Sequence, residues 1–352
     1  MTGPPPTHDE STNVFLRGWN AYRLRWKRRR LLLRAMLKRR ELTSIIDRTG
    51  QISTSDILLF STVRNEALRL PFFLQHYRDL GVTHFLIVDN GSDDGTNTYL
   101  KDQSDVSLWS TKESYKNARF GVDWLAWLRI KYAHGHWCLT VDADEILIYP
   151  HWDTKPLDTL TNWLDDQCIP AFGAMMLELY PKGRTDQTPY VSGQDPTEVL
   201  NWFDAVGYWA ERQWPLGNLW LQGGVRARVF FAGGRQRAPT LNKLPLVKWN
   251  RRYACVNSTH SMLPRKLNFF YDGLQEKQLS GVLLHTKFIH TIAAESIDEQ
   301  RRAQHFHNGA LYDEYYEQLS QSPDLWYPQA IQYRGWQQMV ELGLMSEGDW
   351  CA

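Results

Sequence analysis

The chain has 352 residues, of which 43% are apolar and 13% aromatic, so it can bury the core of one large domain or two modest ones. This composition excludes a fibrous or wholly disordered protein. Its four cysteines are far apart and form no Cys-x-x-Cys pair, which argues against a zinc site or a disulfide framework and favours a reducing compartment.

Charge is unevenly distributed along the chain. Residues 17–40 contain 11 of the 40 Lys and Arg residues and no acid, which leaves 29 basic against 39 acidic residues elsewhere. The body is therefore mildly acidic and carries a basic arm. No apolar run approaches the roughly 18 residues of a membrane span, and Met1–Glu10 is Pro-rich and acidic. We expect neither a spanning helix nor an export leader.

The N-terminal part reads as a disordered tail over 1–13 followed by a basic amphipathic helix within 14–42. Such a helix can lie on an anionic bilayer through residues 15–40. It can also pack on its own domain or a partner subunit. Nucleic acid is a third candidate partner, although the sequence contains no recognised nucleic-acid-binding module. The stripe that defines the apolar face consists of Phe15, Trp19, Tyr22, Trp26, Leu33 and Leu37.

Two strand–turn–helix units follow. An apolar run at 56–63 ends in a polar turn and leads into a helical pattern that stops at Gly81, with Pro71 tolerable only in the first helical turn. A second apolar run, 84–89, breaks into a loop rich in Gly, Asx and Ser ahead of a helix at 97–103.

A third apolar run ends in three carboxylates. Residues 136–141 predict a buried strand, and Asp142, Asp144 and Glu145 follow it at once. Paired carboxylates repel one another unless a cation or protons neutralise them, and Mg²⁺ or Mn²⁺ suits such a pair together with substrate phosphates. The alternative interpretation is a solvated acidic turn.

Alternating strands and helices predict an α/β fold with a mostly parallel sheet, in which ligands bind beyond the carboxyl ends of the strands. The turn after Val63, the loop after Val88 and the acidic turn after Val141 would then open onto one crevice. Three polar loops that converge favour a binding site over a chance acidic turn.

In this order and spacing, the runs Val63-Arg64-Asn65-Glu66, Val88 to Thr96 (VDNGSDDGT) and Val141-Asp142-Ala143-Asp144-Glu145 resemble family 2 glycosyltransferases of the GT-A fold, in the bacterial branch with a DADE-type motif. The resemblance covers about 55–150. It implies a Rossmann-like GT-A sheet over 51–292, with the nucleotide-sugar half at 55–150 and the acceptor half at 151–292, and a helical C-terminal extension over 293–352.

The resemblance also implies an activity and roles for individual residues. The activity is transfer of a sugar from a nucleotide donor, commonly a UDP-sugar, with Mn²⁺ or Mg²⁺ and inversion at the anomeric carbon. Asp144 would bind the metal directly, and Asp142 would approach the ribose or a metal-bound water. The donor side would be formed by Val63, Arg64, Asn65, Glu66, Asp89, Asn90 and Asp94.

An inverting transferase needs a base that takes the proton of the acceptor hydroxyl. Glu178, in the apolar run 172–180, is the candidate, because apolar surroundings raise a carboxyl pKa toward usefulness. Asp204 and Asp186 are the alternatives. Glu178 differs from the Asp more usual in the family, and all three carboxylates could instead pair structurally with an Arg.

Basic and imidazole side chains complete the predicted site. Arg119 could reach a diphosphate, while Arg226 and Arg228, on one face of a predicted strand, could hold phosphate or an anionic acceptor. His285 and Lys287 lie on one side of a late strand. His285 would complete the metal shell and Lys287 would bind phosphate. His260 is the rival metal ligand, and the pair His305 and His307 is not on one helix face, so we expect no metal there.

The sequence therefore predicts a metal-dependent inverting glycosyltransferase that acts on a hydroxyl of a bacterial surface polysaccharide, lipopolysaccharide or glycolipid. We expect it in the cytoplasm at the inner face of the bacterial inner membrane. The alternatives are a nucleotidyltransferase, which the lack of a Gly-rich, Lys-containing loop near Val63 disfavours, and an inactive scaffold or lectin-like protein of the same fold.

Overall fold

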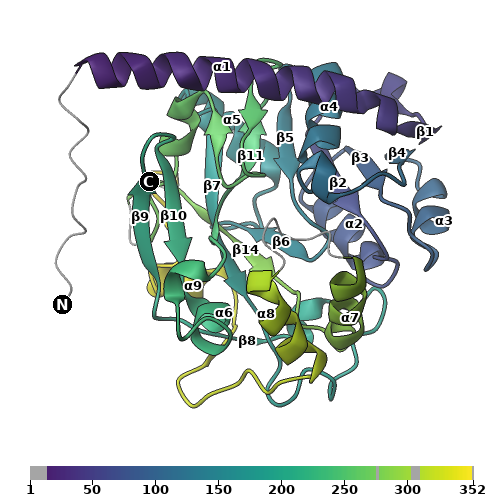
Figure 1. Ribbon diagram of the computed structural model, residues 1–352, viewed down its shortest axis with the longest axis vertical. Helices are drawn as coiled ribbons and strands as arrows, with labels where there is room; N and C mark the ends of the chain where they lie inside the picture. The colour runs from purple at the N-terminus through teal and green to yellow at the C-terminus, as the bar shows by residue number, and fades with distance from the viewer. Residues whose placement is uncertain (1–13, 275–276, 303–309, 351–352) are drawn as a thin grey trace.

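The computed structural model describes residues 14–274, 277–302 and 310–350. The tail predicted at 1–13 and the pair His305 and His307 lie outside the described residues. A nine-stranded sheet in the order β1-β4-β3-β2-β5-β11-β7-β14-β6 runs through the molecule, with helices packed around it (Figure 1).

One half of the sheet consists of parallel strands with helical crossovers. β2 (Leu58–Val63), β3 (His84–Asp89), β4 (Val106–Ser110) and β5 (Trp137–Thr140) pair in parallel. Most of their residues are apolar and buried, as expected of parallel strands that helices cover on both faces. The connecting helices are α2 (Leu70–Asp79), α3 (Thr96–Lys101) and α4 (Val122–Tyr132), and Pro71 lies in the first turn of α2 as predicted.

The other half mixes parallel and antiparallel pairs. β14 (Gly281–His285) lies between β7 (Ala171–Glu178), to which it is parallel, and β6 (Glu145–Ile148), to which it is antiparallel. β11 (Asn242–Lys248) runs antiparallel to both β5 and β7 and so joins the two halves. β1 (Thr43–Ile46) pairs antiparallel with β4 at the far edge.

Shorter elements fill the remainder of the described chain. They are α5 (Leu157–Asp166), β8 (Trp202–Phe203), β9 (Trp209–Gln213), β10 (Asn218–Gln222), α6 (Gly224–Val229), β12 (Ala254–Cys255), β13 (Met262–Leu263), α7 (Ile292–Arg302), α8 (Ala310–Ser320), β15 (Ile331–Gln332) and α9 (Trp336–Glu341). The predicted fold class, an α/β sheet flanked by helices, is confirmed.

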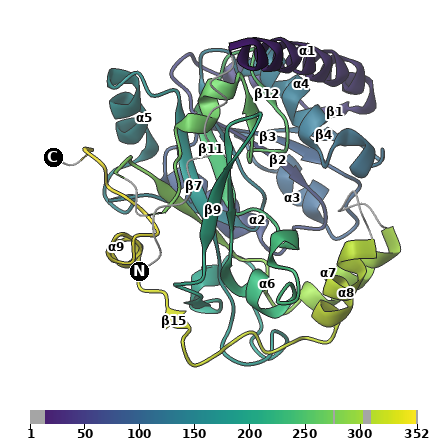
Figure 2. The ribbon, with the colours of Figure 1, turned by 60° about the vertical axis from the view of Figure 1, so that its left-hand side comes forward.

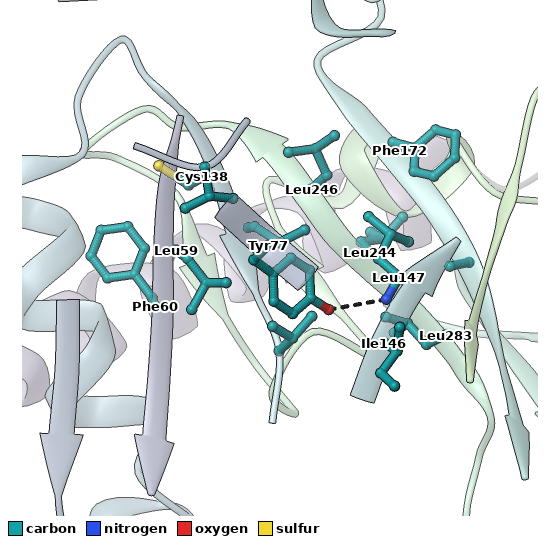
Figure 3. Packing of buried hydrophobic residues seen from close by; sticks show 14 of the residues in the cluster. Leu59, Phe60, Tyr77, Cys138, Ile146, Leu147, Phe172, Leu244, Leu246 and Leu283 are labelled. Atoms are coloured by element: carbon teal, nitrogen blue, oxygen red, sulfur yellow. Dashed lines mark hydrogen bonds between the residues drawn. The ribbon is translucent and has the colours of Figure 1, made fainter. Parts of the chain in front are cut away.

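The core joins α2 to the strand that follows the acidic turn. Tyr77 of α2 is fully buried, and its hydroxyl donates to Glu145 O at 2.9 Å. The same hydroxyl accepts from Leu147 N at 3.0 Å (Figure 3). Leu59, Cys138 and Leu246 from neighbouring strands are buried in the same cluster. The start of β6, and with it Glu145, is thereby held against the core.

The N-terminal helix α1 (Val14–Lys38) lies across one end of the molecule and packs on α4, while α7 and α8 lie toward the opposite end (Figures 1 and 2). Within the described residues, no helix combines the length and the apolar character needed to cross a bilayer.

Candidate active site

A cavity of about 530 Å³ opens where the predicted loops converge. Its walls come from the turn after β2, the acidic turn after β5, the ends of β7 and β14, and helix α7. Carboxyl ends of parallel strands bring these loops together although they are far apart in the sequence. Among the predicted site residues, the cavity is lined by Val63, Arg64, Asn65, Glu66, Asn90, Asp142, Asp144, Arg226, His260, His285 and Lys287.

Strand register places three ionisable side chains in one row. His285, the last residue of β14, is paired with Glu178 of β7 on one side and with Glu145 of β6 on the other. Neighbouring strands lie about 4.8 Å apart, so the side chains of such a row can contact one another. All three are buried. The sheet itself thus brings an imidazole between two carboxylates.

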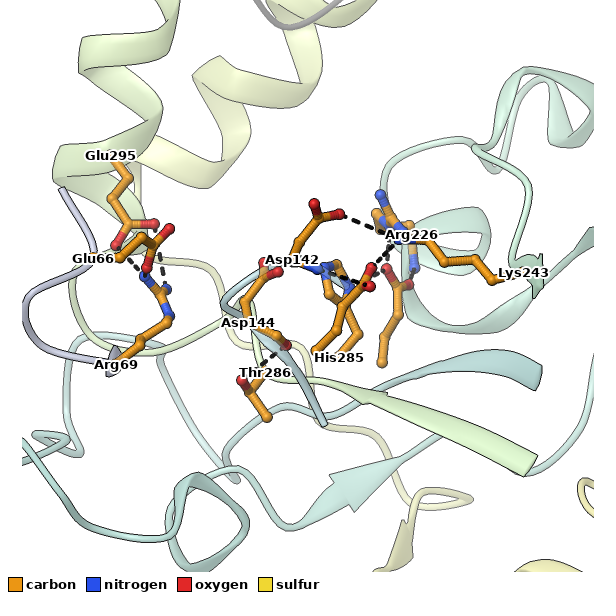
Figure 4. Close-up of polar contacts among 11 residues, drawn as sticks. Glu66, Arg69, Asp142, Asp144, Arg226, Lys243, His285, Thr286 and Glu295 are labelled. Carbon is orange, nitrogen blue, oxygen red and sulfur yellow. Dashed lines mark hydrogen bonds and ion pairs between the residues drawn. The ribbon is translucent and has the colours of Figure 1, made fainter. Parts of the chain in front are cut away.

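His285 also faces the acidic turn. Its Nε2 lies 3.1 Å from Asp144 Oδ2, and its Nδ1 lies 3.5 Å from Glu178 Oε1 (Figure 4). The backbone of Asp144 is fixed because its carbonyl accepts from Thr286 N at 2.7 Å and from Thr286 Oγ1 at 3.0 Å. The acidic turn and the end of β14 are therefore tied together at the point where the two side chains meet.

The charges in this cluster shift one another's pKa values. Burial alone would raise the pKa of Asp144, but His285, helped by Arg69 and Lys287, holds it well below its usual range. Burial alone would lower the pKa of His285, yet Asp144 and Glu178 on its two sides raise it. The pKa of Glu178 is lowered as well, so Asp144 and Glu178 both stay ionised beside the ring.

The donor atoms fit a divalent cation. One ligand atom each from Asp144, Glu145 and His285 lies within 4.8 Å of the others. Carboxylate oxygens suit both Mn²⁺ and Mg²⁺, and the imidazole nitrogen favours Mn²⁺ of the two. A proton on His285 Nδ1, held by Glu178, would leave the Nε2 lone pair directed at Asp144, which is the usual arrangement of a metal-binding histidine and its carboxylate partner.

Lys243 balances the negative charge of the other two carboxylates of the acidic turn, Asp142 and Glu145. Its ammonium group pairs with Glu145 and lies 3.2 Å from Asp142 Oδ2. Burial would lower the pKa of Lys243, but these two carboxylates raise it. Asp142, predicted as a second metal ligand, lies outside the group of Asp144, Glu145 and His285, and its side chain is 57% exposed. Its metal and ribose roles stay predictions.

Two of the three candidate bases, Glu178 and Asp204, are buried in ion pairs, and the third, Asp186, forms an exposed pair with Arg184 at 2.9 Å. Burial alone would raise the pKa of Glu178, but Arg226, with which it pairs, and His285 together lower it. Asp204 accepts from Arg228 Nε at 2.8 Å and from the Tyr180 hydroxyl, and it does not line the cavity. Pairing with an Arg, the structural alternative considered for all three carboxylates, is what the structure shows.

The prediction that a strand carries Arg226 and Arg228 is wrong. The segment forms α6, which begins directly after Gly223, whose φ of 146° is open chiefly to glycine. Residues two apart lie on different faces of a helix, so the two guanidinium groups diverge. Arg226 lines the cavity, whereas Arg228 pairs with Asp204 and donates to Leu325 O at 2.7 Å.

The loop after β3 braces the turn after β2. Asn65 N donates to Ser92 Oγ at 2.9 Å, Glu66 N to Thr96 Oγ1 at 2.8 Å and Ala67 N to Asp94 Oδ2 at 3.0 Å. Asp94 therefore acts within the loop and lies outside the cavity lining. The backbone amides of the turn are already engaged by side chains of the loop.

Three further predicted donor residues also have structural partners. Asp89 is buried and accepts from Ser92 N and Ser92 Oγ, and Asn90 Nδ2 donates to Thr111 O at 3.2 Å and to Glu113 O at 3.0 Å. Arg119 pairs with Asp123 at 2.8 Å and donates to two backbone carbonyls, outside the cavity lining. Their donor-binding roles stay predictions.

Cations and acids alternate along the wall of the cavity that the turn after β2 and helix α7 form. Arg69 Nη1 donates to Glu66 Oε2 at 3.0 Å and to Glu295 Oε1 of α7 at 3.2 Å (Figure 4). Arg64 Nη2 lies 3.8 Å from Asp298 of the same helix. Burial raises the pKa of Glu66 to about 8, against the opposing effect of Arg69. Helix α7 thus pairs its acids with cations that line the cavity.

Sequence reasoning missed Arg69, Glu295 and the pairing of Lys243 with the acidic turn. Arg69 follows Glu66 by three residues, a spacing that predicts a pair on a helical turn. Lys243 and Glu295 come from distant segments, and no local pattern links them to the site. Of the two candidate histidines, His260 binds Asn242 O through Nδ1, and burial lowers its pKa to about 3, whereas His285 faces Asp144.

Comparison with known proteins gives little further information. No protein-family model matches the chain, and no curated protein matches it. Among solved structures, the mannosyltransferase PcManGT from Pyrobaculum calidifontis, in complex with GDP-Man and Mn²⁺, is similar over 49% of this chain, with 18% identity and a TM-score of 0.26. This chain spans only 46% of that mannosyltransferase.

Two further solved structures are also similar in part. A 4-diphosphocytidyl-2C-methyl-D-erythritol synthase shows 16% identity over 41% of this chain and 67% of its own, with a TM-score of 0.24. A protein from Bacillus anthracis named as a glucose-1-phosphate thymidylyltransferase, in complex with a sucrose, shows 7% identity over 75% of this chain and 83% of its own, with a TM-score of 0.28. All three scores are low, so we draw neither fold nor function from these proteins.

Proposed function

We propose that the chain is a metal-dependent glycosyltransferase that takes its sugar from a nucleotide-sugar donor. The observation that carries this proposal is the pair of Asp144 and His285, which faces a cavity that is also lined by Arg64, Arg69 and Lys287. Divalent ions held by carboxylates and cationic side chains both bind the phosphates of a nucleoside diphosphate. A cavity of about 530 Å³ has the size of a small-ligand site.

Within this proposal the chain's own residues bind and orient the donor. The diphosphate lies between the Asp144–His285 pair and the guanidinium groups of Arg64 and Arg69. The nucleoside lies against the turn at 62–66 and Asn90, which line the same cavity. A bound Mn²⁺ or Mg²⁺ would neutralise charge developing on the leaving diphosphate. Inversion and a UDP-sugar remain the expectation that the motif resemblance supplies.

We assign Glu178 a positioning role in place of the predicted role as base. Its carboxylate is buried between Arg226 and His285, so an acceptor hydroxyl would have to displace an ion pair to reach it. Its contact with His285 Nδ1 instead orients the ring and fixes its tautomer. Asp144 and His285 are then the residues that touch the metal and its substrate.

The nucleotidyltransferase alternative has one observation against it. Phosphate loops bind through unengaged backbone N–H groups. In the turn after β2, the amides of Asn65, Glu66 and Ala67 already donate to side chains of the neighbouring loop, and the turn contains no glycine. The turn therefore suits contact with a nucleoside better than it suits a triphosphate.

Product analysis separates the candidate functions. The protein is incubated with Mn²⁺ and either UDP-, GDP- or dTDP-sugars or nucleoside triphosphates plus sugar 1-phosphates. Release of a nucleoside diphosphate that Asp144→Asn abolishes and Asp158→Asn retains supports a glycosyltransferase. Asp158 is an exposed aspartate on α5, outside the cavity lining. Release of pyrophosphate would show a nucleotidyltransferase, and nucleotide-sugar binding without either product would show a binding protein.

A further inference from the structure

Helix α1 exposes a continuous apolar stripe. Phe15 is 89% exposed, Trp19 60% and Trp26 47%, and Tyr22, Leu33 and Leu37 are exposed as well. At about 100° per residue, these side chains fall within about a quarter of the helix circumference. Most of the exposed large apolar side chains in the described part of the chain belong to this helix.

The opposite face of α1 is fixed to the body. Leu24 and Ala35 are buried, Asn20 Nδ2 donates to Pro215 O at 3.1 Å, and Arg34 Nε bonds the buried Asp123 of α4 at 2.5 Å. The helix therefore cannot rotate its aromatic stripe inward without breaking these contacts. The stripe from Phe15 to Leu37 is an outward-facing surface about 33 Å long, at about 1.5 Å per residue, and these contacts hold it in place.

Cations flank the stripe on both sides. The helix carries nine Lys and Arg residues and no acid. On the helical wheel, the exposed Arg25 and Arg29 fall on one flank of the stripe, and the exposed Arg23 and Arg30 fall on the other. A groove of about 840 Å³ runs between the helix and Pro215–Leu216, with Tyr22, Trp26, Leu33, Arg23 and Arg30 among its lining residues.

We propose that α1 lies flat in the headgroup region of an anionic phospholipid bilayer. Aromatic side chains favour the boundary between headgroups and acyl chains, and flanking guanidinium groups attract acidic headgroups. A second copy of the chain would bring one cationic helix against another. Nucleic acid would match the charge but would leave Leu33 and Leu37, the aliphatic part of the stripe, without a partner.

This placement leaves the cavity open to water. Helix α7 lines the cavity and lies toward the end of the molecule opposite α1 (Figures 1 and 2). A chain docked through α1 would thus keep its nucleotide pocket away from the bilayer surface. The inference is independent of the proposed activity, because lipid binding is measured without donor or metal.

Sedimentation of the full chain with vesicles tests the proposal. We expect binding to phosphatidylcholine vesicles that contain about one third phosphatidylglycerol, weaker binding to phosphatidylcholine alone, and release by salt. Arg25→Glu/Arg29→Glu should weaken binding by at least about 30-fold, at about fivefold for each cation removed. Trp19→Glu should weaken it by more than about tenfold.

Matched variants elsewhere on the surface serve as controls. Lys101→Glu/Lys112→Glu changes the net charge equally at two exposed lysines, and Val206→Glu replaces an apolar side chain that is 68% exposed. Both should bind like the wild type, and circular dichroism checks that every variant is folded. Equal binding by all variants, no binding to anionic vesicles, or loss of a dimer in Trp19→Glu without a change in lipid binding would overturn the proposal.

Discussion

At the scale of single residues, the site depends on one imidazole held between two carboxylates. Glu178 contacts His285 Nδ1 and Arg226, and all three are buried. Removing one partner from a buried ion pair leaves the other charge uncompensated. Stability and metal affinity should therefore both depend on Glu178.

Glu178→Gln should lower the free energy of unfolding by about 3 kcal/mol and weaken Mn²⁺ binding by about tenfold. Urea denaturation measures the first effect and calorimetric titration with Mn²⁺ the second. Asp204→Asn is the matched control, because Asp204 is also buried and also pairs with an arginine of α6. It should destabilise the fold without changing metal affinity. Equal metal affinity in Glu178→Gln and the wild type would refute the positioning role.

A second residue-scale effect concerns His76 of α2, which bonds Leu147 O at 3.1 Å. Burial lowers its pKa from 6.5 to about 4, so the folded protein keeps the ring neutral. The contribution of the neutral His76 ring to the free energy of unfolding is complete above pH 6.5 and is lost as the pH falls toward about 4, because only the unfolded chain takes up the proton in that window.

Between about pH 7 and about pH 5, this residue should cost the wild type about 2 kcal/mol of unfolding free energy. His76→Gln keeps a donor for Leu147 O but has no titrating ring, so its free energy of unfolding should fall by about 2 kcal/mol less than that of the wild type over the same pH range. Urea denaturation at the two pH values measures the difference. Identical losses in the two proteins would exclude His76 as the source.

At the scale of elements, α7 competes for the cations that line the cavity. Glu295 pairs with Arg69 and Asp298 with Arg64, and these acids are 38% and 51% exposed. Such partly exposed pairs contribute only about 0.5 kcal/mol each. A diphosphate can therefore displace them at a small cost.

Glu295→Gln/Asp298→Asn should accordingly bind a nucleoside diphosphate about fivefold more tightly, because Arg64 loses its acidic partner Asp298 and Arg69 keeps only Glu66. Calorimetry with Mn²⁺ present measures the change. Asp313→Asn/Glu317→Gln, which removes two exposed acids from α8, is the control with the same change in charge. Unchanged or weaker binding in the α7 variant would mean that these pairs do not compete with ligand.

Local patterns account for the elements that were predicted correctly. The apolar runs that became β2, β3 and β5 end in Gly, Asx or acidic turns, and both signals are readable within a few residues. The run Val225 to Phe230 alternates like a strand yet forms α6, because a short alternating segment does not fix its own period. The stripe on α1 was predictable, but which face packs on α4 depends on tertiary contacts.

At the scale of the whole molecule, the site joins segments that only the completed fold brings together. Asp144 lies in the turn between β5 and β6, His285 at the end of β14 and Glu295 in α7. The turn motifs predicted the donor side and the acidic turn. The ion pairs of Lys243, Arg69 and Arg226 depend on strand order and helix packing, which no local spacing encodes.

The central claim is a metal-dependent nucleotide site built on Asp144 and His285. The most direct measurement is calorimetric binding of UDP, GDP, dTDP, CDP and ADP, with and without Mn²⁺, to the wild type, Asp144→Ala and the control Asp158→Ala. We predict that one nucleotide binds only with Mn²⁺, that Asp144→Ala abolishes this binding, and that Asp158→Ala retains it. Absence of metal-dependent binding for every nucleotide, or full binding by Asp144→Ala, would contradict the proposed site.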